Sequence, residues 1–318
     1  MYRYPLPKQE VYLVNDLGGA GDLIAQFPAV KYAHDIHPHL YITYWVASFI
    51  KTLAKKSLPV SERLVIRSFD EKHLAKDNIP VKKMSQNPYT NLGSHMTEHS
   101  FDLFLNTRPE DPNHYNYLPV NLKGVYINRF NLPEKYVVIP TGYTAKVREF
   151  RPEIVNNLIE YILSKGYTPV FLGRESTPEN SDASKVIKGN FSQEIQFDKG
   201  INLINQTDLL ESTKIIKEAK CIVGLDNGLL HLAATTNVAI VGSFSSVNPS
   251  HRLPYRHGIK GWNYYPVTLT PEELPCVHCQ SNWTFLYGFD FRMCYHTDYR
   301  CTELLIADKY IRELEKIL

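Results

Sequence analysis

A carboxylate in a glycine-rich turn is the first candidate for chemistry in this sequence. Asp22 follows Gly18, Gly19 and Gly21, which come directly after an apolar run typical of a first strand. Glycines let a backbone approach a ligand closely, and a helix that begins here points its N-terminal amides at that ligand. Asp22 either acts on the ligand or caps the helix, and the sequence leaves both interpretations open. A dinucleotide cofactor is disfavoured, because Ile24 takes the place of the third glycine in that fingerprint.

A second turn lies late in the chain, where an apolar strand pattern at 221–224 leads into a helix. The free amides and the positive dipole end of such a helix suit a diphosphate. The residues of this turn that could contact a ligand are Asp226, Asn227, Gly228, Leu229 and His231. A histidine one turn into a helix is also common as a packing residue, so His231 keeps both interpretations.

Both turns sit in a chain whose strand and helix patterns alternate, which predicts an α/β fold with a doubly wound parallel sheet in each half. A boundary near 133 divides the chain into domains 1–133 and 134–302. The predicted strands are 11–14, 40–46, 61–68, 101–106, 136–139, 168–172, 201–204, 221–224 and 238–242, and the predicted helices include 23–33, 152–164, 207–219 and 226–235.

The two turns and a later segment together resemble glycosyltransferase family 9, the heptosyltransferases of lipopolysaccharide core assembly. The segment 21–24, Gly-Asp-Leu-Ile, with Phe-Pro-Ala at 27–29, is similar to the opening of that family. The segment 226–234 and the aromatic-led segment 244–249 follow in the right order. The resemblance spans most of the chain.

This resemblance implies a GT-B fold, in which two Rossmann-like domains face a cleft. The acceptor would bind mainly to the first domain and the nucleotide-sugar to the second, and a C-terminal helix at 303–318 would pack back on the first domain. Members of the family invert the anomeric centre without a metal, and Asp22 falls on the position of their catalytic base. A carboxylate there would take the proton of an acceptor hydroxyl as the glycosidic bond forms.

The resemblance also implies donor-binding residues. Asn227, Gly228 and Leu229 are expected to offer backbone amides to the diphosphate, with Asp226 and His231 near the sugar and phosphate. Two segments differ from the family. In the loop after the strand at 136–139, Arg151 replaces a tryptophan, and after the strand at 238–242, Ser245-Ser246-Val247 replaces Gly-Pro-Thr. Further donor contacts are expected from Thr141, Gly142, Lys146 and Arg148. Glu175, at the carboxyl end of a predicted strand, either contacts the donor or is a solvated loop residue.

Four of the five cysteines lie close together in sequence, at Cys276, Cys279, Cys294 and Cys301. The Cys-x-x-Cys pair and the two later cysteines have the spacing of a structural zinc site, and buried free thiols are the alternative. No cofactor is expected to be needed for catalysis.

The balance of 35 basic and 33 acidic residues gives a net charge of +2, which excludes a strong global attraction to nucleic acid or membranes. Neither a secretory signal nor a membrane span is apparent, so a cytoplasmic protein is expected, with peripheral contact to a membrane or nucleic acid left open. An excess of cations over 51–83 favours an anionic acceptor.

The sequence thus predicts an inverting, metal-independent glycosyltransferase that moves a sugar from a nucleotide-diphosphate sugar to a hydroxyl of an anionic acceptor, such as a lipopolysaccharide core saccharide. Two alternatives remain. One is a glycosyltransferase that acts on hydroxymethylated DNA bases, and the other is a non-catalytic module that binds nucleotide-sugars or carbohydrates.

Overall fold

The computed structural model describes residues 7–14, 19–74, 76, 78–83, 95–142, 146–174, 194–281, 294 and 296–318. The chain divides into two compact units. Unit 1 comprises residues 1–123 and 254–262, and unit 2 comprises residues 124–253 and 263–318. The first division therefore falls before the predicted boundary near 133, and a short segment of the second half of the chain belongs to unit 1.

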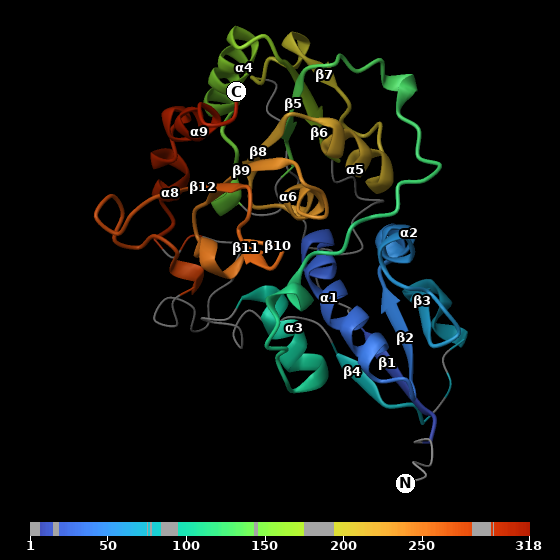
Figure 1. The fold of residues 1–318 in the computed structure, drawn as a ribbon. Helices are drawn as coiled ribbons and strands as arrows, with labels where there is room; N and C mark the ends of the chain where they lie inside the picture. The colour runs from blue at the N-terminus through green and yellow to red at the C-terminus, as the bar shows by residue number, and fades with distance from the viewer. Residues whose placement is uncertain are drawn as a thin grey trace. The chain divides into compact units, whose positions relative to one another are not determined.

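Unit 1 is built on a parallel sheet with the strand order β3-β2-β1-β4 (Figure 1). Its central pair is in register with Val11 opposite Ile42, and both side chains are buried. Helix α1 buries most of its length, including Leu23, Phe27 and Val30 as predicted. The strands are β1 (Gln9–Val14), β2 (Leu40–Val46), β3 (Leu64–Ser68) and β4 (Val81–Lys83), and the helices are α1 (Ala20–Ile36), α2 (Ser48–Ser57) and α3 (Met96–Leu105).

The strand predicted at 101–106 is wrong, because these residues lie at the end of helix α3. Phe101 and Phe104 are both buried and three residues apart, so they share the helix face that packs toward α1. The ring of Phe101 lies 5.5 Å from that of Tyr32 in α1. Asn106 then ends the helix in the left-handed conformation, with φ 53°. Short apolar runs rich in aromatic residues fit a strand or a helix equally well, which explains the error.

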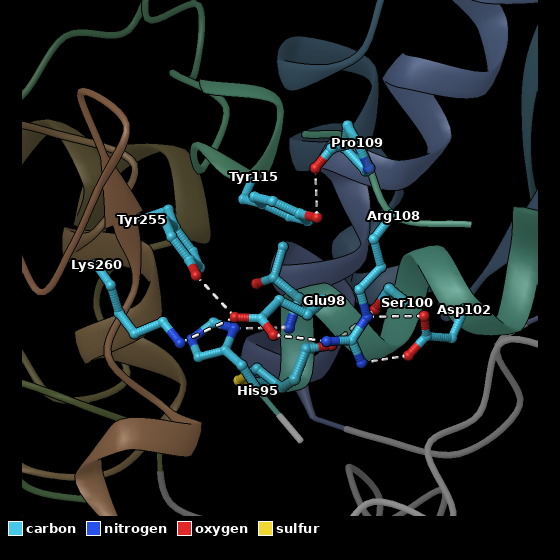
Figure 2. Close-up of polar contacts among 11 residues, drawn as sticks. His95, Glu98, Ser100, Asp102, Arg108, Pro109, Tyr115, Tyr255 and Lys260 are labelled. Atoms are coloured by element: carbon cyan, nitrogen blue, oxygen red, sulfur yellow. Dashed lines mark hydrogen bonds and ion pairs between the residues drawn. The ribbon is translucent and has the colours of Figure 1, made fainter. Parts of the chain in front are cut away.

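A small hairpin at 254–262 docks on unit 1 through a single carboxylate. It consists of β10 (Tyr255–Arg256) and β11 (Ile259–Lys260). As Figure 2 shows, Glu98 of α3 accepts hydrogen bonds from Tyr255 Oη at 2.7 Å, Lys260 Nζ at 2.9 Å and Arg108 Nη1 at 2.9 Å. Only 17% of the Glu98 side chain is exposed, so water screens these contacts less than it would at an open surface. Arg108 in turn holds Asp102, which continues the network along α3.

The network predicts a stability that depends on Glu98 and on pH. Burial raises the pKa of Glu98, but hydrogen bonds from Lys260 and Tyr255 outweigh it, and the net pKa lies below its ordinary value of 4.5. Because the pKa is lowered in the folded state, Glu98 stabilises the fold above about pH 4.5 and loses that effect as the pH falls further. We expect Glu98→Gln to reduce the free energy of unfolding at pH 7 by roughly 1–3 kcal/mol, measured by urea denaturation.

The difference between Glu98→Gln and the wild type should shrink below pH 4. The exposed neighbour Glu110 provides the control, and Glu110→Gln should change the stability by less than about 0.5 kcal/mol. A Glu98→Gln variant as stable as the wild type at pH 7 would contradict the role given to this carboxylate.

Unit 2 holds a larger parallel sheet in the order β12-β9-β8-β5-β6-β7. Counted along the chain from β5, the sheet has the order 3-2-1-4-5-6 read from its β7 edge, which is the order of dinucleotide-binding sheets. The parallel Rossmann-like architecture predicted for both halves is confirmed. The strands are β5 (Tyr136–Pro140), β6 (Thr168–Leu172), β7 (Ile201–Asn202), β8 (Cys221–Leu225), β9 (Ala239–Phe244) and β12 (Tyr264–Thr268), and the helices are α4 (Pro152–Ser164), α5 (Leu209–Glu218), α6 (Gly228–Ala233), α8 (Arg300–Leu304) and α9 (Ala307–Leu314).

The C-terminal helix belongs to unit 2, whereas the sequence predicts that it packs on the first domain. Tyr310 and Leu314 of α9 lie in the hydrophobic core of unit 2. The helix packs against α4, β9 and β12, and the ring of Tyr310 is 5.4 Å from that of Phe150. Its apolar stripe was predicted, but the surface that it covers is set by residues far away in sequence.

Within the described part of the chain, no helix has the length and apolar character needed to cross a membrane.

Candidate functional site

The candidate site lies where the strand order of unit 2 reverses, between β5 and β8. Open α/β sheets bind ligands at such a point, outside the carboxyl ends of the strands. The loop after β5 begins with Thr141 and Gly142, and the turn after β8 begins with Asp226 and Asn227. Asn227 Nδ2 donates a hydrogen bond to the carbonyl oxygen of Gly142 at 3.0 Å. The structure therefore brings together the two predicted donor-binding segments, which are far apart in sequence.

Asp226 is the electrostatic centre of this site. Its carboxylate is only 7% exposed, with Arg148 Nη1 at 4.0 Å from Oδ2 and His231 Nε2 at 3.4 Å from Oδ1. Burial raises the pKa of Asp226, but Arg148, the hydrogen bond from His231, and Arg252 lower it by more. The carboxylate is thus ionised across the physiological range, and it holds Arg148 and His231 at the edge of the sheet.

The start of α6 is already capped by the chain itself. Asn227 Oδ1 accepts hydrogen bonds from the amides of Leu229 at 3.0 Å and Leu230 at 3.3 Å. Leu229 was expected to offer its amide to a diphosphate, and it would do so here only if the Asn227 side chain turned away. The amides of Asn227 and Gly228 have no acceptor among the described residues, so these two remain available to a ligand.

A narrow pocket opens beside Asp226 on the same edge of the sheet. Its walls include Arg148, Asp226, Ser245 and Ser246, with Thr302 and Tyr310 from the C-terminal helices. Ser245, Ser246, Thr302 and Tyr310 were not predicted from the sequence to belong to the site. The departure from Gly-Pro-Thr at 245–247 could have indicated that the two serines belong to the site. Nothing in the local sequence indicates that α8 and α9 lie at this edge of the unit 2 sheet.

The remaining predicted donor contacts are placed differently. Thr141 is buried, and its Oγ1 donates to the carbonyl oxygen of Leu172 at 3.2 Å, so it fixes the strand ends. Lys146 is exposed and lies 4.7 Å from the centre of the Tyr299 ring, a cation–π distance. Glu175 and Gly18 lie outside the described residues.

In unit 1, Asp22 occupies the third position of α1, at the carboxyl edge of the smaller sheet. Its Oδ2 accepts a hydrogen bond from the Gly19 amide at 3.0 Å, so the capping interpretation is confirmed. A side chain added at Gly19 would meet no atom within 4 Å, whereas Gly21 is buried in the first turn of the helix. Asp22 is half-buried, and a carboxylate can accept several hydrogen bonds at once. Capping and a chemical role are therefore compatible.

The basic stretch of unit 1 is partly neutralised within the fold. Lys51 and Arg67 both pair with Glu71, Arg67 at 3.2 Å. The hydrogen bond from Lys51, followed by those from Ser68 and Arg67, lowers the pKa of Glu71 to about 2. Arg63 donates to backbone carbonyls at the end of α1. These cations support the sheet and its helices, which reduces the charge that this stretch presents to a polyanion.

The four clustered cysteines lie near enough to influence one another's titration. Burial raises the pKa of Cys301 to about 12, and Cys279, Cys294 and Cys276 add to that shift. Burial and the same neighbours raise the pKa of Cys279 to about 11. Across the residues that the structure describes, however, no group of three or more His, Cys, Asp or Glu side chains is arranged to hold a metal ion. The four thiols are near one another, but their described positions do not have the geometry of a metal site.

The family model of glycosyltransferase family 9 (heptosyltransferase) matches residues 63–280, which include the turn at 226–231 and the segment 244–249. The chain belongs to glycosyltransferase family 9. Among curated proteins, none matches the chain in sequence. As a member of this family the chain is a glycosyltransferase, and the non-catalytic alternative is set aside.

Solved structures of glycosyltransferases share the fold of this chain at low sequence identity. The dodecameric, iron-containing glycosyltransferase TibC from enterotoxigenic E. coli H10407 has a TM-score of 0.73 and 15% identity, with 99% of this chain and 77% of that chain covered. A family 9 glycosyltransferase from Veillonella parvula DSM 2008 has a TM-score of 0.64 and 13% identity, with 99% of each chain covered. ADP-heptose lipopolysaccharide heptosyltransferase II from E. coli has a TM-score of 0.59 and 14% identity, with 95% of this chain and 99% of that chain covered.

The close approach of β5 and β8 gives a stability test of the site's scaffold. A Cβ atom added at Gly224 in β8 would lie 2.4 Å from Cγ of Pro140, whose ring cannot move aside. We expect Gly224→Ala to lower the free energy of unfolding by roughly 1–3 kcal/mol through overpacking, measured by chemical denaturation. Gly142→Ala is the control, because its nearest neighbour would be the carbonyl oxygen of Arg174 at 3.9 Å. Equal stabilities of the two variants would refute this account of the strand contact.

Proposed function

We propose that the chain transfers a glycosyl group, with inversion and without a catalytic metal, from a nucleotide-diphosphate sugar to a hydroxyl of an anionic saccharide. The observation that carries the donor part is the convergence of Arg148, Asp226 and the free amides of Asn227 and Gly228 at the strand-order reversal of unit 2. A structure of TibC contains ADP-D-beta-D-heptose, and a structure of E. coli WaaC contains an ADP-fluoroheptose. An ADP-heptose is therefore the donor to test first.

The reaction needs a base and a stabilised leaving group. In this proposal Asp22 removes the proton of the acceptor hydroxyl, and the oxygen attacks the anomeric carbon of the donor. The bond between that carbon and the diphosphate breaks, and the nucleoside diphosphate leaves with the electron pair. Arg148 and the amides of Asn227 and Gly228 stabilise the charge that develops on it, as oriented donors do at other reacting oxyanions. His231 holds Asp226 in place beside them.

The acceptor is inferred from charge and from the family. The stretch 51–83 keeps a cationic excess after its acidic residues, including Glu71, are counted, which suits a saccharide with a few phosphate or carboxylate groups. The lipopolysaccharide core is such a saccharide. We propose that the protein acts in the cytoplasm, at the surface of the membrane that carries this acceptor. Among the residues of unit 1 that the structure describes, no contact specifically favours the DNA alternative.

The test of the catalytic assignment is Asp22→Asn. This substitution keeps the shape of the side chain and an oxygen for the Gly19 amide, but it removes the base. We expect kcat for glycosyl transfer to fall by about 10²–10⁴-fold, with the thermal unfolding temperature within a few degrees of the wild type. Product formation from ADP-heptose and a truncated lipopolysaccharide core, followed by mass spectrometry, measures the rate.

A second capping carboxylate provides the control for this experiment. Glu211 occupies the third position of α5 and bonds back to the amide of Asp208, as Asp22 does to Gly19. Glu211→Gln should lower the stability by about 0.5–2 kcal/mol and leave kcat unchanged. Near-full activity of a folded Asp22→Asn variant would reject Asp22 as the base.

We further propose that Cys276, Cys279, Cys294 and Cys301 bind one structural zinc ion. Thiolates are preferred ligands of zinc, and a bound zinc ion would compensate the negative charge that buried thiols acquire when they lose their protons. The related TibC is described as iron-containing, so both metals should be measured.

Elemental analysis of the purified protein should find about one zinc per chain. Cys279→Ser should lose most of it, while Cys221→Ala should keep it, because Cys221 lies in β8 outside the cluster. Metal content near zero in the wild type would reject the proposal, and iron in place of zinc would correct the identity of the ion.

A further inference from the structure

One residue that lines the pocket beside Asp226 carries a buried hydroxyl group that the fold leaves without a partner. Ser246, in the segment after β9, is only 2% exposed and lines the pocket. Its Oγ makes no hydrogen bond with any residue in the described part of the chain. The adjacent Ser245 is different, because its Oγ donates to the carbonyl oxygen of Val147. Of two neighbouring serines, one is therefore used by the fold and the other is not.

The backbone fixes Ser246 in this position. The amide of Gln280 donates to the Ser246 carbonyl oxygen at 2.8 Å, and the amide of His278 donates to that of Ser245 at 3.2 Å. The next residues are held as well, because the Asn248 amide donates to Ser281 Oγ at 2.9 Å. The segment cannot easily rotate to bring the hydroxyl to another acceptor. Burying a hydroxyl without a partner destabilises a protein, so the position of Ser246 calls for an explanation, and a ligand in the adjoining pocket provides one.

The neighbours of Ser246 in the pocket limit what that ligand can be. Asp226 and Arg148 line the same pocket, and Asp226 is ionised because Arg148 and His231 stabilise its charge. An ionised carboxylate in a narrow pocket repels a phosphate group, so the part of the donor that enters the pocket is an uncharged one. A carboxylate, a guanidinium and a hydroxyl together can satisfy both the donor and the acceptor functions of an alcohol. The free space of the pocket is about the size of one water molecule, so it admits a single hydroxyl-bearing arm and not a whole ring.

We propose that Ser246 is a specificity-determining residue, whose hydroxyl hydrogen-bonds one hydroxyl of the sugar that is transferred. This inference rests on the proposed function, because it requires a nucleotide-sugar at this edge of unit 2. It extends that function by naming the part of the donor that Ser246 contacts. At the corresponding place the family motif quoted above carries proline, which has no hydroxyl. The contact would therefore distinguish this chain within its family.

The experiment compares two ligands and two serines. Binding of ADP and of ADP-heptose is measured by calorimetry for the wild type, Ser246→Ala and Ser245→Ala, together with the unfolding temperature of each ligand-free protein. Ser246→Ala should weaken binding of ADP-heptose by about 5–10-fold and leave that of ADP unchanged. Its unfolding temperature should equal or exceed that of the wild type, because the substitution removes an unsatisfied buried group. Ser245→Ala should unfold at a lower temperature and change the affinities for ADP and ADP-heptose to the same extent.

The outcomes separate this inference from the function on which it rests. If the wild type binds ADP and ADP-heptose and Ser246→Ala binds both as the wild type does, or loses both equally, then Ser246 does not contact the sugar. A marked loss of stability in ligand-free Ser246→Ala would show that its hydroxyl has a partner within the fold, which also overturns the inference. If the wild type binds neither ligand, the proposed donor is wrong, and the assignment of Ser246 to its sugar is rejected with it.

Discussion

Asp226 carries a negative charge in a place from which the protein excludes almost all water, and unit 2 is organised around that constraint. A buried ion costs several kcal/mol unless cations and donors surround it. Here they come from three directions: Arg148 from the loop after β5, His231 from α6, and Arg252 from the segment after β9. Three separate segments, two loops and helix α6, must therefore meet at one edge of the sheet. The carboxylate holds them there before any ligand arrives.

Close packing of the strands makes that meeting possible. Gly224 lets β8 lie against Pro140 of β5, and Asn227 bridges the loops that leave these two strands. The same Asn227 caps α6, so the positions of the helix and of the loop after β5 are coupled through one side chain. A site of this kind is preorganised: its charges are oriented by the fold and need little rearrangement when a ligand binds.

Much of this arrangement could be predicted from local sequence. Glycine turns after apolar strands located Asp22 and Asp226, and the alternating patterns gave two parallel sheets. The errors arose where the deciding contacts are distant in sequence. Residues 101–106 form a helix because Phe101 meets Tyr32, and α9 packs in unit 2 because Tyr310 meets Phe150. Ser246 was visible only as a departure from a motif. Its lack of a partner is a property of the surrounding fold, which no single segment encodes.

The hairpin at 254–262 makes the two units inseparable along the chain. It leaves unit 2 after Leu253, docks on Glu98 and Tyr117 of unit 1, and returns at Asn263. No single cut in the backbone can release either unit intact. A fragment that ends at Lys123 would keep Arg108 beside Glu98 but would lack Lys260 and Tyr255, leaving a half-assembled charge network and an uncovered Tyr115 ring. Exchange of unit 2 with that of a relative cannot be made at one junction, because the hairpin must stay with the unit 1 on which it docks.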